Sequence, residues 1–444
     1  MSLVETLDAI VKRIAGQSSY ERCEAVANVS RDLFTTQEGG FISSFNFAGS
    51  MRFIAEDDIE NFSASIDNAL KDLFRAEGHC LSFYLDRSAS NANQLVKNIF
   101  TTSLKSLNTL GFKSPIPAAR KKHLKRLLQP FNITLTITTG LSALSEQERQ
   151  SILDEHYQKL ENAPKFKPDQ SQLNGISELL NKHLSFTKAF KTQLGKICLM
   201  QQISCDETLY RAHDALYRVS SRGNKKTFQL LPQSYSIRRS QKNKENGLTA
   251  PSVAEQILNE DLSPVESDPT LVAVGENLFA PLYLPHAPFD PKPLSNLLEL
   301  IDQVPFRMAV HLLTGNESVK STANLLTSRA RNFKIFDENN KDIYKAGEYF
   351  LSRLKQGESG VNVSFSFVTW AKDAATLRRN REIMAAGISS WGGCSTHYER
   401  GDTIDALLST IPLFGSRSKS PPKHPWLFKD LVPLLPFFGV CSAV

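Results

Sequence analysis

The sequence is poor in the features that mark secreted and membrane-spanning proteins. Its six cysteines are scattered and form no Cys-x-x-Cys pair, which is typical of a reducing compartment. Asp8 lies where a signal peptide requires an apolar stretch. No window reaches the roughly 18 to 20 uninterrupted apolar residues that a membrane-spanning helix needs. We therefore expect a cytoplasmic protein whose association with a membrane is peripheral or made through a partner.

The sequence also lacks a complete nucleotide-binding motif. Residues 315–322 read Gly-Asn-Glu-Ser-Val-Lys-Ser-Thr. A phosphate-binding loop needs a second Gly where Lys320 stands, because that Gly lets the backbone N–H groups turn toward the phosphates. The segment is therefore expected to be an ordinary turn between a strand and a helix, and we expect no nucleotide to bind this chain.

A complete catalytic constellation is missing as well. Cys394, His397 and Glu399 are close in sequence and could supply a thiol nucleophile with its base. Residues three apart on a strand point to opposite faces, however, which favours a packed thiol. The chain is accordingly not expected to be an enzyme, with a thiol enzyme built on Cys394 as a rival hypothesis.

Two further motifs have both a functional and a structural interpretation. His79, Cys80 and His311 could ligate a metal, but no second cluster at zinc-ligand spacing accompanies them, so buried side chains are favoured and no metal or other cofactor is expected. Residues 391–393, Trp-Gly-Gly, could form a binding loop or simply a turn that leads out of a helix ending near Gly387.

Alternating patterns predict strand, helix, strand units. Residues 41–47 and 80–86 alternate apolar with polar residues, as half-buried strands do, and residues 59–74 between them place apolar side chains on one helical face. The predicted fold class is α/β, more narrowly α+β, with mixed sheets and a largely helical middle region. Further strands are expected at 133–138, 271–284, 306–313, 361–369 and 394–398.

A chain of 444 residues is long enough for more than one core, since single cores usually stop growing near ~250 to 300 residues. We expect an N-terminal α/β domain at 1–140, a helical subdomain with a basic loop at 141–250, and a second α/β domain at 251–420. Residues 421–444 would begin a connection to a further domain. Their last part, 431–444, carries no charged side chain, as if the chain were entering another buried element.

Positive charge is concentrated in one region. Residues 118–250 hold 22 basic and 11 acidic residues, a net charge of +11, which leaves −5 for the rest of a chain whose total is +6. Part of it lies in the loop predicted at 223–251, which is polar and exposed. The excess suggests an acidic neighbour, whether nucleic acid, anionic lipid or protein. The candidate docking residues are Arg120, Lys121, Lys122, Lys125, Arg126, Arg238 and Arg239.

The basic run at 120–126 has two further interpretations. Leu124, Leu127 and Leu128 could form the apolar side of a helix whose charged face is merely solvated. A nucleic-acid-binding module that uses residues 118–250 is the alternative function, but Phe131 is the nearest aromatic available for stacking on bases.

The C-terminal third carries a family resemblance. A strand at 361–369 is followed by Asp373, the segment 401–412 (Gly-Asp-Thr-Ile-Asp-Ala-Leu-Leu-Ser-Thr-Ile-Pro) and the segment 431–437 (Leu-Val-Pro-Leu-Leu-Pro-Phe). This order resembles the N-terminal portion of the type IV secretion and conjugation ATPases, most closely the DotO/IcmB kind within the TraC/TrbE-like family. The resemblance covers residues 270–440 well and the first 120 more loosely.

The resemblance implies a non-catalytic assembly domain. In that family the domain precedes a RecA-like motor, forms a homo-oligomer such as a hexamer, and docks on other secretion components at the cytoplasmic face of the bacterial inner membrane. ATP and Mg²⁺ would bind only in the motor, whose motifs would follow Val444. The expected function is thus assembly and docking in protein transport.

Overall fold

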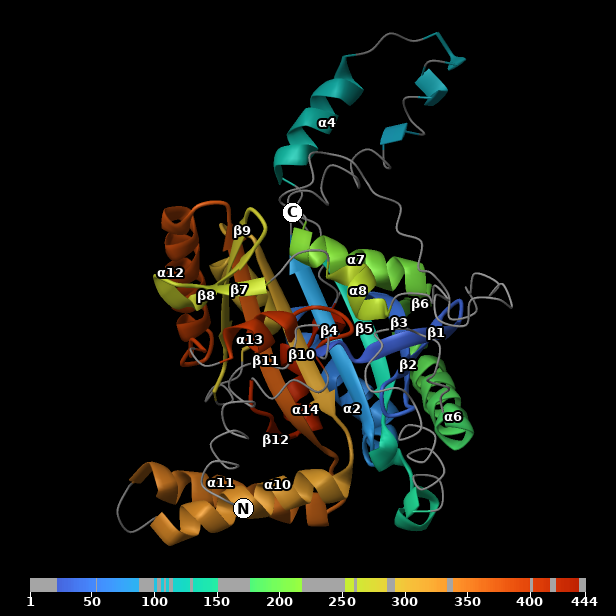
Figure 1. Cartoon of the computed structure of the whole chain (residues 1–444), viewed down its shortest axis with the longest axis vertical. Coiled ribbons are helices and arrows are strands. Elements are labelled where there is room, and N and C mark those ends of the chain that lie inside the picture. The colour runs from blue at the N-terminus through green and yellow to red at the C-terminus, as the bar shows by residue number, and fades with distance from the viewer. Residues whose placement is uncertain are drawn as a thin grey trace, which may run out of the picture.

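The computed structural model of this chain describes most of its residues, and these form a β-sheet with helices packed against both faces (Figure 1). The described residues are 22–52, 54–87, 100–101, 105–107, 109–111, 115–127, 131–150, 176–217, 252–258, 262–285, 292–333, 338–399, 402–415 and 421–438.

The sheet has 12 strands, and every pair is antiparallel. β6 (Cys198–Gln202) pairs with β3, and β12 (His424–Leu427) pairs with β11. The other strands follow the spatial order β1 (Ala25–Ser30), β2 (Leu33–Thr36), β3 (Phe41–Ser50), β5 (Phe131–Thr139), β4 (His79–Arg87), β10 (Phe306–Leu313), β11 (Gly360–Ala371), β9 (Asn277–Tyr283), β8 (Asp268–Val274) and β7 (Leu262–Val265).

The predicted α+β class is confirmed. The first strand, helix, strand unit is β3, α2 (Ile59–Phe74) and β4, with β5 inserted between its two strands. β4 also pairs with β10 along its whole length, so strands from 1–140 and from 251–420 belong to one sheet. The domain boundaries proposed from sequence stay a prediction.

One face of the sheet is apolar and carries the larger core. Residues aligned across five neighbouring strands form an apolar row on this face: Phe45, Leu135, Phe83, Val310 and Phe365. Apolar side chains of five helices cover the row, as expected where burial of a helix's apolar stripe stabilises the fold. These helices are α2, α6 (Ser177–Leu194), α9 (Leu294–Leu300), α12 (Ala374–Ser390) and α14 (Phe428–Leu431).

The opposite face is covered too. Its cover consists of α7 (Cys205–Tyr217), α8 (Val253–Ile257) and α13 (Thr403–Leu408), whose apolar side chains form a second cluster with Trp370 and Phe279. Every residue of β11 is consequently buried. The prediction that 41–47 and 80–86 are half-buried strands was therefore wrong. Both segments are strands, but nearly all of their residues are buried, because both faces of the sheet are covered.

The apolar segment near the C-terminus packs into this chain's own core. Two short 3₁₀ turns, η4 (Val432–Leu434) and η5 (Pro436–Phe438), follow α14. The Phe437 ring lies edge-on to Phe47 and Phe83, with centroids 5.8 and 5.4 Å apart. Burial in this core accounts for the composition of 431–438, so that composition no longer supports a following domain.

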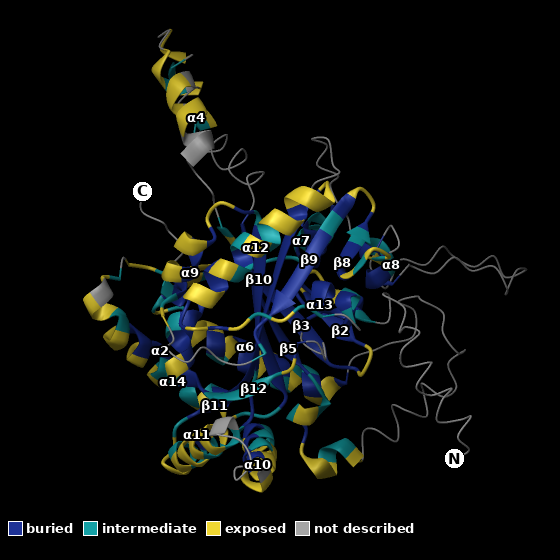
Figure 2. Cartoon of the chain, turned by 90° about the vertical axis from the view of Figure 1, so that its left-hand side faces the viewer, coloured by how far each residue is buried: buried dark blue, intermediate teal, exposed yellow. Residues whose placement is uncertain are grey.

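Two helical elements project from the sheet (Figures 1 and 2). α10 (Asn316–Phe333) and α11 (Glu338–Lys355) form a hairpin that connects β10 to β11. α4 (Ile116–Leu127), between β4 and β5, stands away from the rest of the described chain in both views. Among the described helices, none is long and apolar enough to cross a membrane.

The middle region differs from the prediction at one point. The helices α6 and α7 agree with a largely helical segment, but β6 lies between them and joins the sheet.

The strand predicted at 394–398 is reduced to one bridge between Tyr283 and His397. The remaining short elements are η2 (Glu56–Asp58) and η3 (Leu141–Ala143).

Candidate functional site

The segment around Lys320 forms the turn from β10 into α10, as the sequence predicts. The Glu77 carboxylate accepts hydrogen bonds from the backbone N–H groups of Glu317 (2.8 Å) and Ser318 (3.4 Å), at the positive end of the helix. Gly315 approaches this carboxylate so closely that a Cβ would lie 2.0 Å from a Glu77 oxygen. An anion of the protein's own thus occupies the place where a phosphate would bind.

The Cys394 thiol is buried and its hydrogen bond goes to the backbone. Its Sγ donates to the Trp391 carbonyl at 2.9 Å, and burial raises the pKa of Cys394 to about 11. The His397 ring packs against Tyr283 instead, and the Glu399 carbonyl accepts from the Thr403 hydroxyl. These positions give no activated thiolate, because a thiolate forms readily only where the pKa is lowered.

Residues 391–393 form the turn that follows α12, which ends at Ser390 rather than near Gly387. Gly392 and Gly393 both adopt positive φ, as a tight turn out of a helix requires. The Trp391 ring is fully buried, and its Nε1 donates to the carbonyl of Lys292 at 2.8 Å. A small pocket of about 260 Å³ adjoins it, but the indole is not free to stack on a ligand.

His79, predicted as a core side chain, shares one buried network with His183, which the sequence patterns did not single out. The Thr139 hydroxyl lies 2.9 Å from Nδ1 of both His79 and His183, and His183 Nε2 lies 2.9 Å from the Ser43 hydroxyl. Desolvation lowers the pKa of His79 to about 3 and that of His183 to about 4. Both rings are therefore neutral at physiological pH and serve as packing and hydrogen-bonding groups.

The most unusual feature is a polar row that crosses the centre of the sheet on the face opposite the apolar row. Cross-strand pairing aligns its five members directly, and each is almost completely buried. A second row on the same face lies two residues away along each strand, and three of its five positions are polar. The first row is Ser44, Thr136, Ser82, His311 and Ser364; the second is Ile42, Thr138, Cys80, Leu313 and Asn362.

His311 is the member of the polar row on β10, between Ser82 and Ser364. Its Nε2 lies 2.9 Å from the Ser409 carbonyl oxygen, which can only accept, so Nε2 carries the proton. Nδ1 therefore accepts from the Ser82 hydroxyl at 2.8 Å. Burial lowers the pKa of His311 to about 3, so this histidine is a fixed neutral hydrogen-bonding group at physiological pH.

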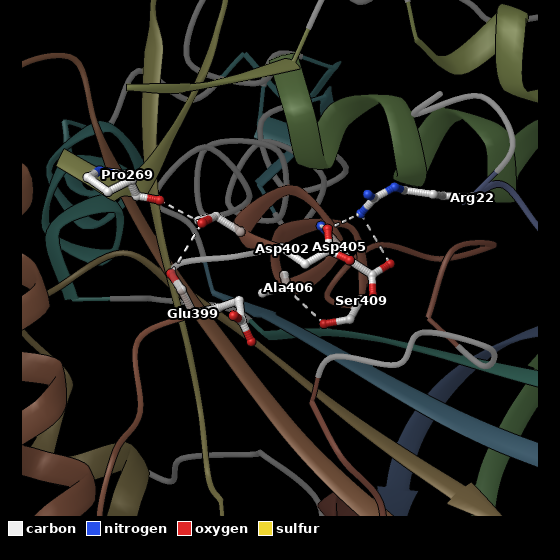
Figure 3. A network of polar contacts seen from close by, with 8 residues as sticks. Arg22, Pro269, Glu399, Asp402, Asp405, Ala406 and Ser409 are labelled. Carbon is white, nitrogen blue, oxygen red and sulfur yellow. Dashed lines mark hydrogen bonds and ion pairs between the residues drawn. The ribbon is translucent and has the colours of Figure 1, made fainter. Parts of the chain in front are cut away.

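The backbone of the segment 402–415 approaches His311 at Ser409 and Gly415. Several polar contacts hold the segment in place (Figure 3). The Arg22 guanidinium binds the carboxylates of Asp402 (2.7 Å) and Asp405 (3.4 Å). The Thr403 hydroxyl donates to the carbonyl of Pro269. A Cβ at Gly415 would lie 2.2 Å from His311 Cε1, which shows how closely the backbone approaches the ring. Residues 402–412, one of the segments on which the expected resemblance depends, are thus part of a structural cover.

Arg307 is buried beneath the same cover. Its Nε donates to the Thr410 hydroxyl at 3.1 Å, and its Nη1 donates to the carbonyl of Ala215 in α7 at 2.9 Å. The guanidinium also lies 5.8 Å from the centre of the Trp370 ring. Arg307 thereby connects α7, the turn that follows α13 and the sheet, which makes it a structural cation.

The polar row and the second row together combine hydroxyls, an amide, a thiol and a neutral imidazole. Burial raises the pKa of Cys80 to about 11, so neither it nor His311 changes charge near neutral pH. Such a set can hold polar atoms by hydrogen bonds. It does not offer a base with a pKa near 7, which general acid–base catalysis favours.

Sequence reasoning missed this row as a unit. The alternation in each strand was visible, for example Thr134, Thr136 and Thr138 between apolar residues. Sequence alone does not reveal the register between strands, which brings residues 229 positions apart, such as Ser82 and His311, into contact.

The predicted docking residues fall on α4 and on a segment outside the described part. α4 contains basic but no acidic residues between Ile116 and Leu127, and the side chains of Arg120 and Lys122 are exposed. The side chains of Lys121, Lys125 and Arg126 are not described. Arg238 and Arg239, with the whole loop predicted at 223–251, also lie outside the described residues.

Within the part of the chain that the structure describes, His, Cys, Asp and Glu side chains form no group of three suited to a metal ion. Compared with the models of known protein families, the sequence matches none. A comparison with curated proteins likewise gives no match.

Proposed function

We propose that this chain is an assembly and docking domain, of the kind that precedes the motor of type IV secretion ATPases, and that α4 is the element by which it docks. The observation that carries the proposal is the combination of charge and position in α4. Five basic residues without an acidic one lie on a helix that stands away from the body (Figure 2). A helix placed in this way can reach a partner surface without any rearrangement of the sheet.

Electrostatics favours an acidic partner for α4. Opposite charges steer association and fix orientation, whereas an isolated cluster of like charges adds nothing to the fold. The sequence resemblance supplies the rest of the proposal. It implies a homo-oligomer, such as a hexamer, docked on secretion components at the cytoplasmic face of the bacterial inner membrane, with nucleotide turnover confined to a motor domain.

The test is a charge reversal confined to α4. In the variant, Arg120, Lys121, Lys122, Lys125 and Arg126 are all changed to Glu, and recruitment to isolated inner membranes that carry the secretion apparatus is measured by co-sedimentation. We expect recruitment to fall, and the difference from the wild type to shrink as salt rises, because exposed charges are screened beyond ~8 to 10 Å at physiological ionic strength.

A matched control reverses five exposed basic residues elsewhere: Lys320, Lys341, Lys345, Arg378 and Arg379. It changes the net charge equally and leaves α4 intact, so recruitment should stay near the wild-type level. Equal losses in both variants would show that only total charge matters, and unchanged recruitment in the α4 variant would place docking elsewhere.

The alternative function, nucleic-acid binding through residues 118–250, is separated by titration with DNA over a salt series. Phosphate contacts give a steep decrease of log K with log salt, whose slope rises with the number of phosphates neutralised. Tight binding with such a slope, lost in the α4 variant, would favour the nucleic-acid module over the docking domain.

A further inference from the structure

Four buried polar atoms on the covered face of the sheet have no hydrogen-bond partner in the protein. They are Ser44 Oγ, Thr138 Oγ1, Ser364 Oγ and Asn362 Oδ1. Their residues are between 2% and 5% exposed, so bulk solvent does not reach them. Buried polar groups in folded proteins are almost always bonded to protein or to ordered water, and four exceptions in one region require an explanation.

The four atoms fall into two pairs. Ser44 and Thr138 are diagonal neighbours on β3 and β5, because Ser44 lies opposite Thr136 and Thr138 is two residues further along. Asn362 and Ser364 are two residues apart on β11 and therefore point to the same face. The pairs lie on opposite sides of the Ser82–His311 hydrogen bond in the middle of the sheet.

The pair on β3 and β5 has one further polar neighbour, because Cys80 lies opposite Thr138. His311 lies opposite Ser364, but both of its ring nitrogens already have partners, so it adds no hydrogen bond to the pair on β11. The Asn362 side chain is held from its other end, since its Nδ2 donates to the Thr322 hydroxyl at 3.4 Å. An internal water makes between two and four hydrogen bonds, so the two unpartnered atoms of each pair are enough to bind it.

We propose that these two pairs are binding sites for internal water molecules, one beside β3 and β5 and one beside β11. Water suits the chemistry of the sites. Hydroxyl and amide oxygens are neutral, and a water molecule can satisfy them without bringing a net charge into the interior.

The test counts long-lived internal water in the full chain by magnetic relaxation dispersion of the water oxygen nucleus. Thr138→Val and Ser364→Ala each remove one anchoring hydroxyl, and Thr138→Val preserves the shape of the side chain. We expect each variant to lose a part of the relaxation amplitude equal to at least one water molecule, and the double variant to lose the sum.

The matched control is Thr134→Val, on the same strand and face as Thr138. The Thr134 hydroxyl already accepts from Arg211 Nη1 at 2.9 Å, so its removal should leave the amplitude unchanged. Should Thr138→Val not fold, Ser44→Ala removes the other hydroxyl of that site and gives the same readout.

The proposal is overturned if Ser364→Ala keeps the wild-type relaxation amplitude and the variant at the other site, Thr138→Val or Ser44→Ala, keeps it too. A high-resolution crystal structure decides independently. Density for single waters within hydrogen-bond distance of the four atoms supports the proposal. Dry sites, or density for a larger molecule, contradict it. None of these outcomes depends on docking by α4.

Discussion

Three buried neutral histidines should make this protein sensitive to mild acid. His79, His183 and His311 have pKa values of about 3, 4 and 3, each lowered mainly by desolvation. In the unfolded chain they titrate near ~6.5. At a pH between the folded and the unfolded pKa values, the histidines bind protons when the chain unfolds. The free energy of unfolding therefore falls as the pH falls below ~6.5.

The size of the effect follows from the same values. At pH 5 an unfolded histidine with a pKa of ~6.5 stabilises the unfolded state by about 2 kcal/mol, while the buried ring is still unprotonated. The three histidines together would lower the free energy of unfolding by about 6 kcal/mol relative to pH 8. That is a large fraction of the roughly 5 to 15 kcal/mol of stability typical of a domain.

The assay is urea unfolding at several pH values from 8 to 5, in the wild type and in His311→Gln. His311 is the best target because His79 and His183 influence each other through Thr139. The variant loses hydrogen bonds and should be less stable at pH 8. Its free energy of unfolding should nevertheless fall less steeply between pH 6 and pH 5, by about 1 kcal/mol per pH unit.

Comparing the wild type with His311→Gln removes the contribution of other groups to the pH dependence. These groups include Asp67 and Asp430, whose pKa values are raised by burial. His123→Gln, at an exposed position on α4, removes a histidine outside the core and is the control for the loss of one imidazole. An unchanged slope in His311→Gln would refute the conclusion that burial keeps this imidazole neutral.

Two further predictions concern the motifs that first suggested chemistry. Because the Cys394 thiol is buried and has a pKa of about 11, only about one molecule in 10⁴ carries the thiolate at pH 7. Iodoacetamide should leave Cys394 unmodified in the native protein and label it in denaturant, as read by peptide mass spectrometry; rapid native labelling would contradict the assignment. Glu77→Ala removes the carboxylate at the start of α10 and should cost about 1 kcal/mol of stability in urea unfolding. Glu77→Gln keeps an acceptor and should lose less, whereas an unchanged midpoint in Glu77→Ala would show that the contact is not stabilising.

Local elements were predictable because their determinants are local. The alternating patterns at 361–369 and 133–138 predicted the strands β11 and β5, and the apolar face at 59–74 predicted the helix α2. Ser145 and Glu148 are three residues apart and form a capping box, with hydrogen bonds of 2.7 and 3.3 Å in its two directions. These features depend on neighbours only a few residues away.

Long-range features were not predictable from one sequence. Alternation shows which side chains share a face of a strand, but it does not show that α7 and α13 cover the polar face. The apolar segment 431–438 could equally have entered another domain, and its partner α2 lies far away in the sequence. The candidate polar row depends entirely on such pairings, so its members were visible singly but not as a site.

The pairing of β4 with β10 has a consequence for biosynthesis. Ser82 leaves the ribosome 229 residues before His311, its partner on the neighbouring strand. At translation speeds of ~5 to 20 residues per second, β4 waits more than ten seconds with one backbone edge unpaired. Exposed strand edges readily pair with other chains, so the nascent protein passes through an interval in which chaperones would protect it from aggregation.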